Sequence, residues 1–195
     1  NTTFYVQVDG DDILGPNGTF DITVSDNGAM NAYALNDSIC NATPIGLVPS
    51  GGVSATISSN NFCAGEEPGE PNVSGSSFVT TSAYDETVWF TFTTSATPGT
   101  ITVDVFNTTP GGLDGVINVY RNLLPSSCSF SNLQFLRGAT TLSFGDVSLE
   151  LVCLEPNTTY WVQVDGLDVL GDNGTFDIRV SDNGFPVLPP AYNDI

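Results

Sequence analysis

Hydrophobic and polar residues alternate along most of the chain, and this period of two predicts β-strands. In residues 87–94 (TVWFTFTT), Val88, Phe90 and Phe92 fall on one face of the predicted strand. The same pattern predicts further strands at residues 3–8, 19–24, 100–106, 116–120, 133–136, 148–154, 160–164 and 175–180. Turn-forming Gly, Pro, Asn and Asp separate these strands, and no stretch has an amphipathic helical period. We therefore expect an all-β fold, an antiparallel two-sheet β-sandwich of jelly-roll type.

A long internal repeat organises the chain. Residues 1–28 and residues 157–184 are identical at 22 of 28 positions, with a period of 156 residues. An Asn-Asp pair follows each copy, at 36–37 and at 193–194. Self-similarity at a fixed period is typical of tandem repeats. We interpret each copy as the last two strands of a module, paired as a hairpin.

The repeat divides the chain into four expected parts. These are a C-terminal hairpin of a preceding repeat (1–28), a linker (29–35), one complete module (36–184), and a Pro-rich linker with the start of the next repeat (185–195). A lone hairpin with an apolar face is marginal in water. It would either complete the upstream module of a covalent array or enter a neighbouring subunit by strand addition.

Composition excludes several classes of function. The 195 residues include 22 Asp and Glu, three Arg, no Lys and no His, for a net charge of −19. A nucleic-acid partner requires a basic surface, which three arginines cannot supply. Without histidine there is no Ser-His-Asp or Cys-His catalytic site. No apolar run approaches the ~20 residues of a membrane helix, so we expect no membrane insertion. We expect a protein that is not an enzyme.

Four cysteines, Cys40, Cys63, Cys128 and Cys153, indicate disulfides. There is no C-x-x-C pair, which disfavours a metal or redox site. Of the three pairings that four cysteines allow, we favour the nearest-neighbour one, Cys40–Cys63 with Cys128–Cys153. Disulfides in turn indicate an oxidising compartment, so we expect an extracellular or cell-surface location.

Several segments between residues 36 and 184 resemble known repeats. They are NDSICNATPIGL, ETVWFTF, LDGVINVYR and the closing NTTYWVQVDG with GTFDIRVSDN. Together they resemble a tandem repeat of large secreted Bacteroidota proteins and the bacterial pre-peptidase C-terminal domain, a small β-sandwich of exported enzymes. The resemblance implies a secreted surface module without catalysis and supports the nearest-neighbour disulfides. The family often has Cys-Gly at the second cysteine, where this chain has Cys63-Ala64-Gly65, so the pairing stays open.

Calcium is the one cofactor that the acidic loops suggest, because Ca²⁺ binds six to eight oxygens, often carboxylates. The candidate ligands lie close together near the end of the module: Asp165, Asp168, Asp172 and Asp177. The spacing is not that of an EF-hand, and a solvated turn explains the same residues. Asp114 is a weaker candidate, and we expect Glu66, Glu67 and Glu70 to form a solvated loop.

Glycosylation sites are a second class of candidate. Asn-x-Ser/Thr motifs occur at eight asparagines: Asn1, Asn17, Asn36, Asn41, Asn72, Asn107, Asn157 and Asn173. Such motifs accept N-glycans on exposed positions of exported chains. Ser38, in Asp37-Ser38-Ile39, resembles the Bacteroidota O-glycosylation motif. A Thr- and Asn-rich strand composition explains these motifs equally well.

Trp89 lies out of phase with the apolar face of strand 87–94, so we expect it on the solvent face, where it could stack on a sugar. Three hypotheses for function follow from these observations. The first is a structural repeat of an extracellular filament or giant adhesin, whose partners are identical neighbouring repeats or subunits. The second is a carbohydrate- or surface-binding module of a multidomain secreted protein, with glycans as partners. The third is a non-catalytic accessory domain of an exported enzyme.

Overall fold

The computed structural model describes residues 5–6, 19, 21–24, 34–71, 86–108, 113, 115–124, 127–141, 145–166 and 173–185. The chain divides into two compact units, Asn1–Met30 and Asn31–Ile195. Every strand formed by the described residues lies in the second unit. The predicted calcium ligands Asp114, Asp168 and Asp172 and the sequons at Asn1, Asn17 and Asn72 lie outside the described residues.

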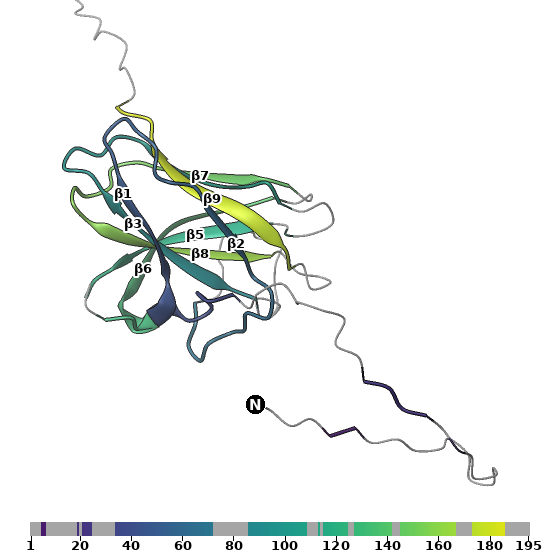
Figure 1. Cartoon of the computed structure of the whole chain (residues 1–195). Coiled ribbons are helices and arrows are strands. Elements are labelled where there is room, and N and C mark those ends of the chain that lie inside the picture. Colours follow the sequence, from purple (N-terminus) through teal and green to yellow (C-terminus); the bar gives the residue numbers. More distant parts are fainter. Residues whose placement is uncertain are drawn as a thin grey trace, which may run out of the picture. The chain divides into compact units, whose positions relative to one another are not determined.

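The second unit is a two-sheet β-sandwich (Figure 1), as the alternation of residues predicted. Sheet A has the strand order β1-β3-β8-β5-β6, and sheet B has the order β2-β9-β4-β7. Neighbouring strands are antiparallel except β1, which runs parallel to β3. The bounds are β1 (Thr43–Val48), β2 (Ile57–Asn60), β3 (Val88–Thr94), β4 (Ile101–Phe106), β5 (Gly115–Asn122), β6 (Leu133–Thr140), β7 (Val147–Leu151), β8 (Thr159–Gly166) and β9 (Thr175–Asp182).

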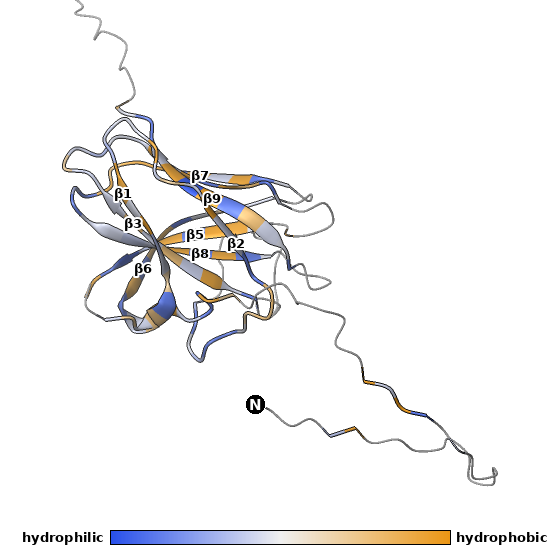
Figure 2. Cartoon of the chain, viewed as in Figure 1, coloured by the Kyte–Doolittle hydropathy of each residue, from blue (hydrophilic) through white to orange (hydrophobic). Residues whose placement is uncertain are grey.

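The main core lies between the two sheets. Burial alternates strictly along β4 and β9, and hydrophobic and hydrophilic residues alternate along β9 in Figure 2. Sheet B therefore has one apolar face inside and one polar face in solvent. The rings of Phe90 on β3 and Phe176 on β9 meet edge-on, with centroids 6.0 Å apart, and so join the two sheets.

Sheet A is buried on both faces. Residues of β5 and β8 are buried almost without alternation, although their sequences alternate in polarity. A second, smaller cluster on the outer face of sheet A explains this burial: Ile39, Trp89 and Tyr120, with Phe130 and Trp161 packed against them. The segments that cover this face carry the two short 3-10 turns, η1 (Ile39–Asn41) and η2 (Phe130–Asn132). No helix in the described part of the chain is long and apolar enough to span a membrane.

Among the predicted strands, one pairing is wrong, and two strands, β1 and β2, were not predicted. The predicted hairpin of residues 157–184 is wrong, because β8 is a central strand of sheet A and β9 a central strand of sheet B. β1 escaped the sequence pattern because its register against β3 shifts between Pro44 and Gly46, and Gly46 has φ +100°. β2 escaped it because its sequence, ISSN, holds a single apolar residue.

Candidate functional site

The most unusual surface of the module is the outer face of sheet A, where polar residues are buried rather than solvated. We call residues 61–71 the covering loop, because its second half, from Glu67 to Pro71, lies over this face. Trp89 donates from Nε1 to Glu70 Oε1 of this loop (3.1 Å), and Gln163 Nε2 donates to the same oxygen (3.2 Å) and to the Pro71 carbonyl (3.2 Å). The loop is thus held to sheet A by hydrogen bonds to two strands, β3 and β8.

Trp89 is fully buried, with 0% of its surface exposed. Its ring centroid lies 5.9 Å from that of Tyr120 and 5.7 Å from that of Phe130 on η2. The prediction of a solvent-facing Trp89 is therefore wrong, and no sugar can stack on this ring in the folded module. Trp89 does lie on the outer face of β3, as its place in the alternation predicted. That face, however, is covered by η2 and the covering loop and not by solvent.

Glu70 is the acidic group of this buried cluster, and it is not part of a solvated loop as predicted. Burial raises the pKa of its carboxyl, while hydrogen bonds from the Glu67 backbone, Gln163 and Trp89 act in the opposite direction. Glu67 is also engaged, since its carboxylate accepts from Ser38 Oγ (3.0 Å) and from the Ile39 backbone N–H (2.8 Å). Glu66 is the exposed acid of the three.

A hydrogen-bonded row continues across the neighbouring strands. Trp89, Gln163 and Asn118 are direct neighbours on β3, β8 and β5. The Tyr120 hydroxyl donates to Gln163 Oε1 (2.7 Å), and Asn118 Nδ2 donates to the same oxygen (3.2 Å). Burial raises the pKa of the Tyr120 hydroxyl, so it stays a neutral donor at ordinary pH. These bonds satisfy groups that would otherwise be costly to bury.

Asp165 lies at the far end of β8 on the same face and is 2% exposed. Its Oδ1 accepts from the Gly166 backbone N–H (2.7 Å), and its Oδ2 accepts from Thr87 Oγ1 (3.3 Å). Burial raises the pKa of Asp165 to about 8, and the charges of Glu70 and Glu86 add to that effect.

Asp177, another predicted calcium ligand, lies on β9 in the other sheet. Its carboxylate accepts from Ser58 Oγ (2.6 Å) and Asn107 Nδ2 (2.7 Å), and these hydrogen bonds lower its pKa. Among the described residues, no three His, Cys, Asp or Glu side chains are grouped so that they could hold a metal ion. Because Asp168 and Asp172 lie outside those residues, the four-aspartate calcium site stays a prediction.

The described glycosylation candidates differ in accessibility. Asn41, Asn107 and Asn157 are exposed. Asn36 is 3% exposed and donates to the Trp89 carbonyl (2.9 Å), so it cannot carry a glycan in the folded module. Asn173 is half-buried and donates to Glu86 (2.9 Å). The Ser38 hydroxyl bonds Glu67 and also accepts from the Cys40 backbone N–H (3.3 Å), where it caps η1.

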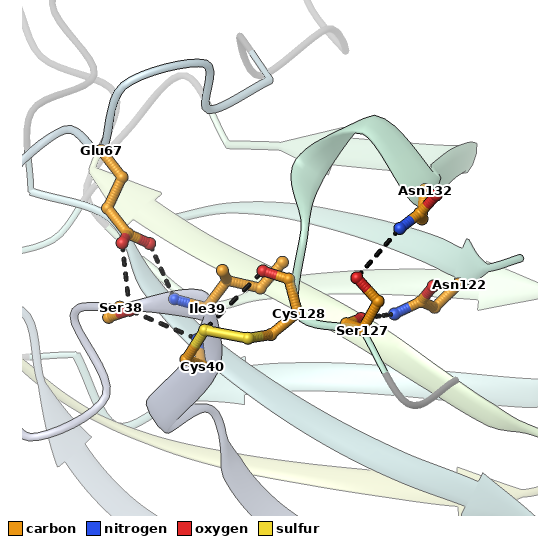
Figure 3. Close-up of a disulfide and its surroundings, with 8 residues drawn as sticks. All are labelled: Ser38, Ile39, Cys40, Glu67, Asn122, Ser127, Cys128 and Asn132. Atoms are coloured by element: carbon orange, nitrogen blue, oxygen red, sulfur yellow. Dashed lines mark hydrogen bonds between the residues drawn. A yellow bond between two sulfur atoms is a disulfide. The ribbon is translucent and has the colours of Figure 1, made fainter. Parts of the chain in front are cut away.

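One disulfide joins Cys40 on η1 to Cys128 in the loop after β5, across 88 residues of sequence (Figure 3). It lies beside the Ser38–Glu67 contacts, and the Asn122 and Asn132 amides hold the neighbouring Ser127 (Figure 3). The favoured nearest-neighbour pairing is therefore wrong. The disulfide and the covering loop together fix the segments that bury the outer face of sheet A.

The other two cysteines, Cys63 and Cys153, are free and exposed. Both have left-handed backbone conformations, with φ of 57° and 59°. Cys153 lines an open groove of about 410 Å³ together with Arg121, Arg137, Glu155 and Tyr160. Two of the three cations of this acidic chain therefore lie beside one thiol. Sequence reasoning missed this arrangement, because the three residues are distant in sequence.

Comparison with known proteins adds little beyond the fold. No protein-family model matches the sequence, and no curated protein matches it significantly. Among solved structures, the chain is similar to the pre-peptidase C-terminal domain of a collagenase from Bacillus anthracis. The two are 17% identical with a TM-score of 0.36, over 72% of this chain and 94% of that domain. A likeness of this size carries no argument about function.

Proposed function

We propose that this chain is a structural repeat of an extracellular filament or giant surface adhesin, built from β-sandwich modules in series. The observation that carries the proposal is the near-identity of residues 1–28 to residues 157–184. In the folded module the second copy supplies β8, between β3 and β5, and β9, between β2 and β4. Both positions are internal to their sheets, so another copy can enter this module only by replacing residues 157–184.

The two copies differ sharply in burial. Ile22 and Val24 of the first copy are 57% and 84% exposed, whereas their equivalents Ile178 and Val180 are 0% exposed. Full burial of one such aliphatic side chain stabilises a fold by about 1.5–3 kcal/mol. The first copy therefore gains several kcal/mol when it packs into strands outside this module. Strands of a preceding module in a covalent array would supply that surface, as would a neighbouring subunit in strand exchange.

The disulfide and the charge fit an extracellular role. A disulfide that closes a long loop persists in oxidising compartments. The 195 residues carry a net charge of −19 and include parts of two repeats, so each module carries a smaller but still strongly negative charge. Repeated along an array, this charge keeps the modules soluble and repels neighbouring filaments. In this proposal the module is inert, and its stability comes from the two cores and the Cys40–Cys128 bond.

The experiment that tests the proposal is association of the full 195-residue chain with Cys63→Ser and Cys153→Ser, which keeps the Cys40–Cys128 disulfide. Association is measured by sedimentation and by electron microscopy. We expect concentration-dependent oligomers that lengthen into filaments as residues 1–28 of one chain replace residues 157–184 in another. Boiling in SDS separates the two modes, because strand-exchanged subunits fall to one small band and a covalent array from the native source stays large. A monomer at every concentration contradicts the structural role and favours an accessory module.

A matched pair of variants locates the contact. Ile22→Asp places a charge at the position equivalent to Ile178, which is buried, and we expect it to abolish association. Thr23→Asp adds the same charge at the position equivalent to Arg179, which is only partly buried, and should leave association intact. Equal effects of the two variants would show that the apolar face of the first copy does not drive assembly.

A further inference from the structure

The two free thiols lie at opposite ends of the sandwich. Cys63 comes three residues after Asn60, which lies opposite Thr175, the first residue of β9. Cys153 comes two residues after Leu151, the last residue of β7. Leu151 lies opposite Ile101 of β4, which in turn lies opposite Asp182, the last residue of β9. The two cysteines are therefore separated by the whole length of β9.

They also lie on opposite edges of sheet B, since β2 and β7 are its outer strands. Three strand spacings of about 4.8 Å and seven residues at about 3.3 Å place Asn60 and Leu151 roughly 27 Å apart. The three and two residues that lead from them to Cys63 and Cys153 cannot bring the two cysteines closer than about 8 Å. A disulfide needs Cα atoms within about 7 Å of each other. Cys63 and Cys153 thus cannot pair within one folded module.

Each thiol lies where the chain enters or leaves the module. At one end, the Ala34 backbone N–H donates to the carbonyl of Phe62, the neighbour of Cys63 (3.2 Å). At the other end, the Thr100 N–H donates to the Gly184 carbonyl (2.9 Å), on the side where Cys153 lies. The next repeat starts at Asn193, eight residues after Phe185, a span of at most about 29 Å. In an array, the Cys153 end of one module therefore faces the Cys63 end of the next.

The charges at the two ends are complementary. Cys153 shares its groove with Arg121 and Arg137. Arg121 is paired with Glu155 (2.7 Å), whereas Arg137 is exposed and forms no ion pair with any residue the structure describes. Cys63 is followed three residues later by the exposed Glu66. Opposite charges at two facing surfaces steer their encounter and set their register.

We propose that Cys153 of one module forms a disulfide with Cys63 of the following copy, and that Arg137 and Glu66 steer this contact. The inference rests on the proposed function, because it requires copies that follow one another end to end. The disulfide joins neighbouring modules by a second covalent connection, in addition to the peptide linker. The partner is a second copy of this chain, and no other protein is needed.

The bond forms by thiol–disulfide exchange with a disulfide oxidant, either a small molecule such as oxidised glutathione or a protein disulfide. The Cys153 thiol loses its proton, and its sulfur attacks the oxidant to give a mixed disulfide and one released thiolate. The Cys63 thiolate of the next copy then attacks the Cys153 sulfur, and the second oxidant thiolate leaves. Two protein thiols are oxidised, one oxidant disulfide is reduced to two thiols, and the protons pass to the released thiolates.

The test uses two single variants of the full chain, Cys63→Ser, which keeps Cys153, and Cys153→Ser, which keeps Cys63. The second is labelled with nitrogen-15, and the two are mixed in glutathione redox buffer at low ionic strength. Mass spectrometry of the non-reduced products then separates the mixed dimer from the two homodimers. We expect the mixed dimer to exceed either homodimer at least tenfold. Dimers in a statistical 1:2:1 ratio, or no dimer at all, would overturn the inference.

Charge reversal tests the steering. Arg137→Glu in the Cys63→Ser chain should slow mixed-dimer formation by about three- to fivefold at low salt, and Glu66→Arg in the partner should restore it. Arg179→Glu changes the net charge equally on the solvent face of β9 and should have no effect; an equal slowing by Arg179→Glu would refute the steering. Sedimentation of the double variant Cys63→Ser/Cys153→Ser, which keeps the Cys40–Cys128 disulfide, is measured in parallel. If this variant associates while no mixed dimer forms, the disulfide alone is overturned and the proposed function stands.

Discussion

Replacing Asp165 with Asn tests the burial of a carboxyl on the outer face of sheet A. Burial raises the pKa of Asp165 to about 8, from an ordinary value of 3.8. Between these two pH values the folded protein keeps a proton that the unfolded chain releases. The free energy of unfolding therefore falls as pH rises, by up to 1.36 kcal/mol per pH unit. Over about four units the loss amounts to roughly 5 kcal/mol, complete above the folded pKa and absent below pH 4.

Asp165→Asn removes the titration but keeps the shape of the protonated group. Its amide still accepts from the Gly166 N–H, and it can donate to the Thr87 hydroxyl that lies beside it. We expect the variant and the wild type to be equally stable near pH 4. At pH 8 the variant should be the more stable by several kcal/mol. Glu70 also has a raised pKa and is present in both proteins; because its charge adds to the pKa shift of Asp165, its influence on that group is counted in the Asp165 contribution.

The assay is urea unfolding followed by tryptophan fluorescence, at pH steps from 4 to 9 in one buffer system. The difference in midpoint between the two proteins, at equal m-value, gives the Asp165 contribution alone. Asp177→Asn is the matched control, because the pKa of Asp177 is lowered. It should leave the high-pH slope unchanged and weaken the protein above pH 4. Parallel stability curves for wild type and Asp165→Asn would refute the burial argument.

Other substitutions test the remaining features of the fold. Replacing both Cys40 and Cys128 with Ala should lower the free energy of unfolding by about 4–5 kcal/mol, from loop-closure entropy, and a non-reduced peptide map of the wild type should contain no other intramolecular pair. Trp89→Ala should cost about 3–5 kcal/mol in urea unfolding, and glycan-array binding that is present in the wild type and lost in this variant would contradict its burial. Gly99→Ala should lower the melting temperature by several degrees, because its Cβ would meet the backbone of Gly184; a neutral effect would show that this strand contact is loose. Millimolar Ca²⁺ should raise the melting temperature if the four predicted aspartates bind it, and EDTA should reverse the rise; no shift would remove the calcium prediction.

Strands β4, β7 and β9 of sheet B were predictable from sequence because each has one buried and one solvated face. Alternation along 100–106 and 175–180 reflects that environment directly. Trp89 shows where this logic fails. A strand face that carries polar residues shows the same sequence pattern whether solvent or another segment of the chain covers it. The covering segments here, η1, η2 and residues 61–71, are irregular and have no period of their own.

The sequence by itself determined the all-β class of the fold and the near-identity of residues 1–28 and 157–184. Period-two alternation reports local strand geometry, and repetition needs no structure to be seen. Only the tertiary structure decided which cysteines pair, that β8 and β9 separate into two sheets, and that two arginines meet one thiol. These depend on contacts between residues far apart in the chain: Cys40 and Cys128 are 88 residues apart. Residues so far apart in sequence come into contact only when the two sheets pack together and a loop crosses them.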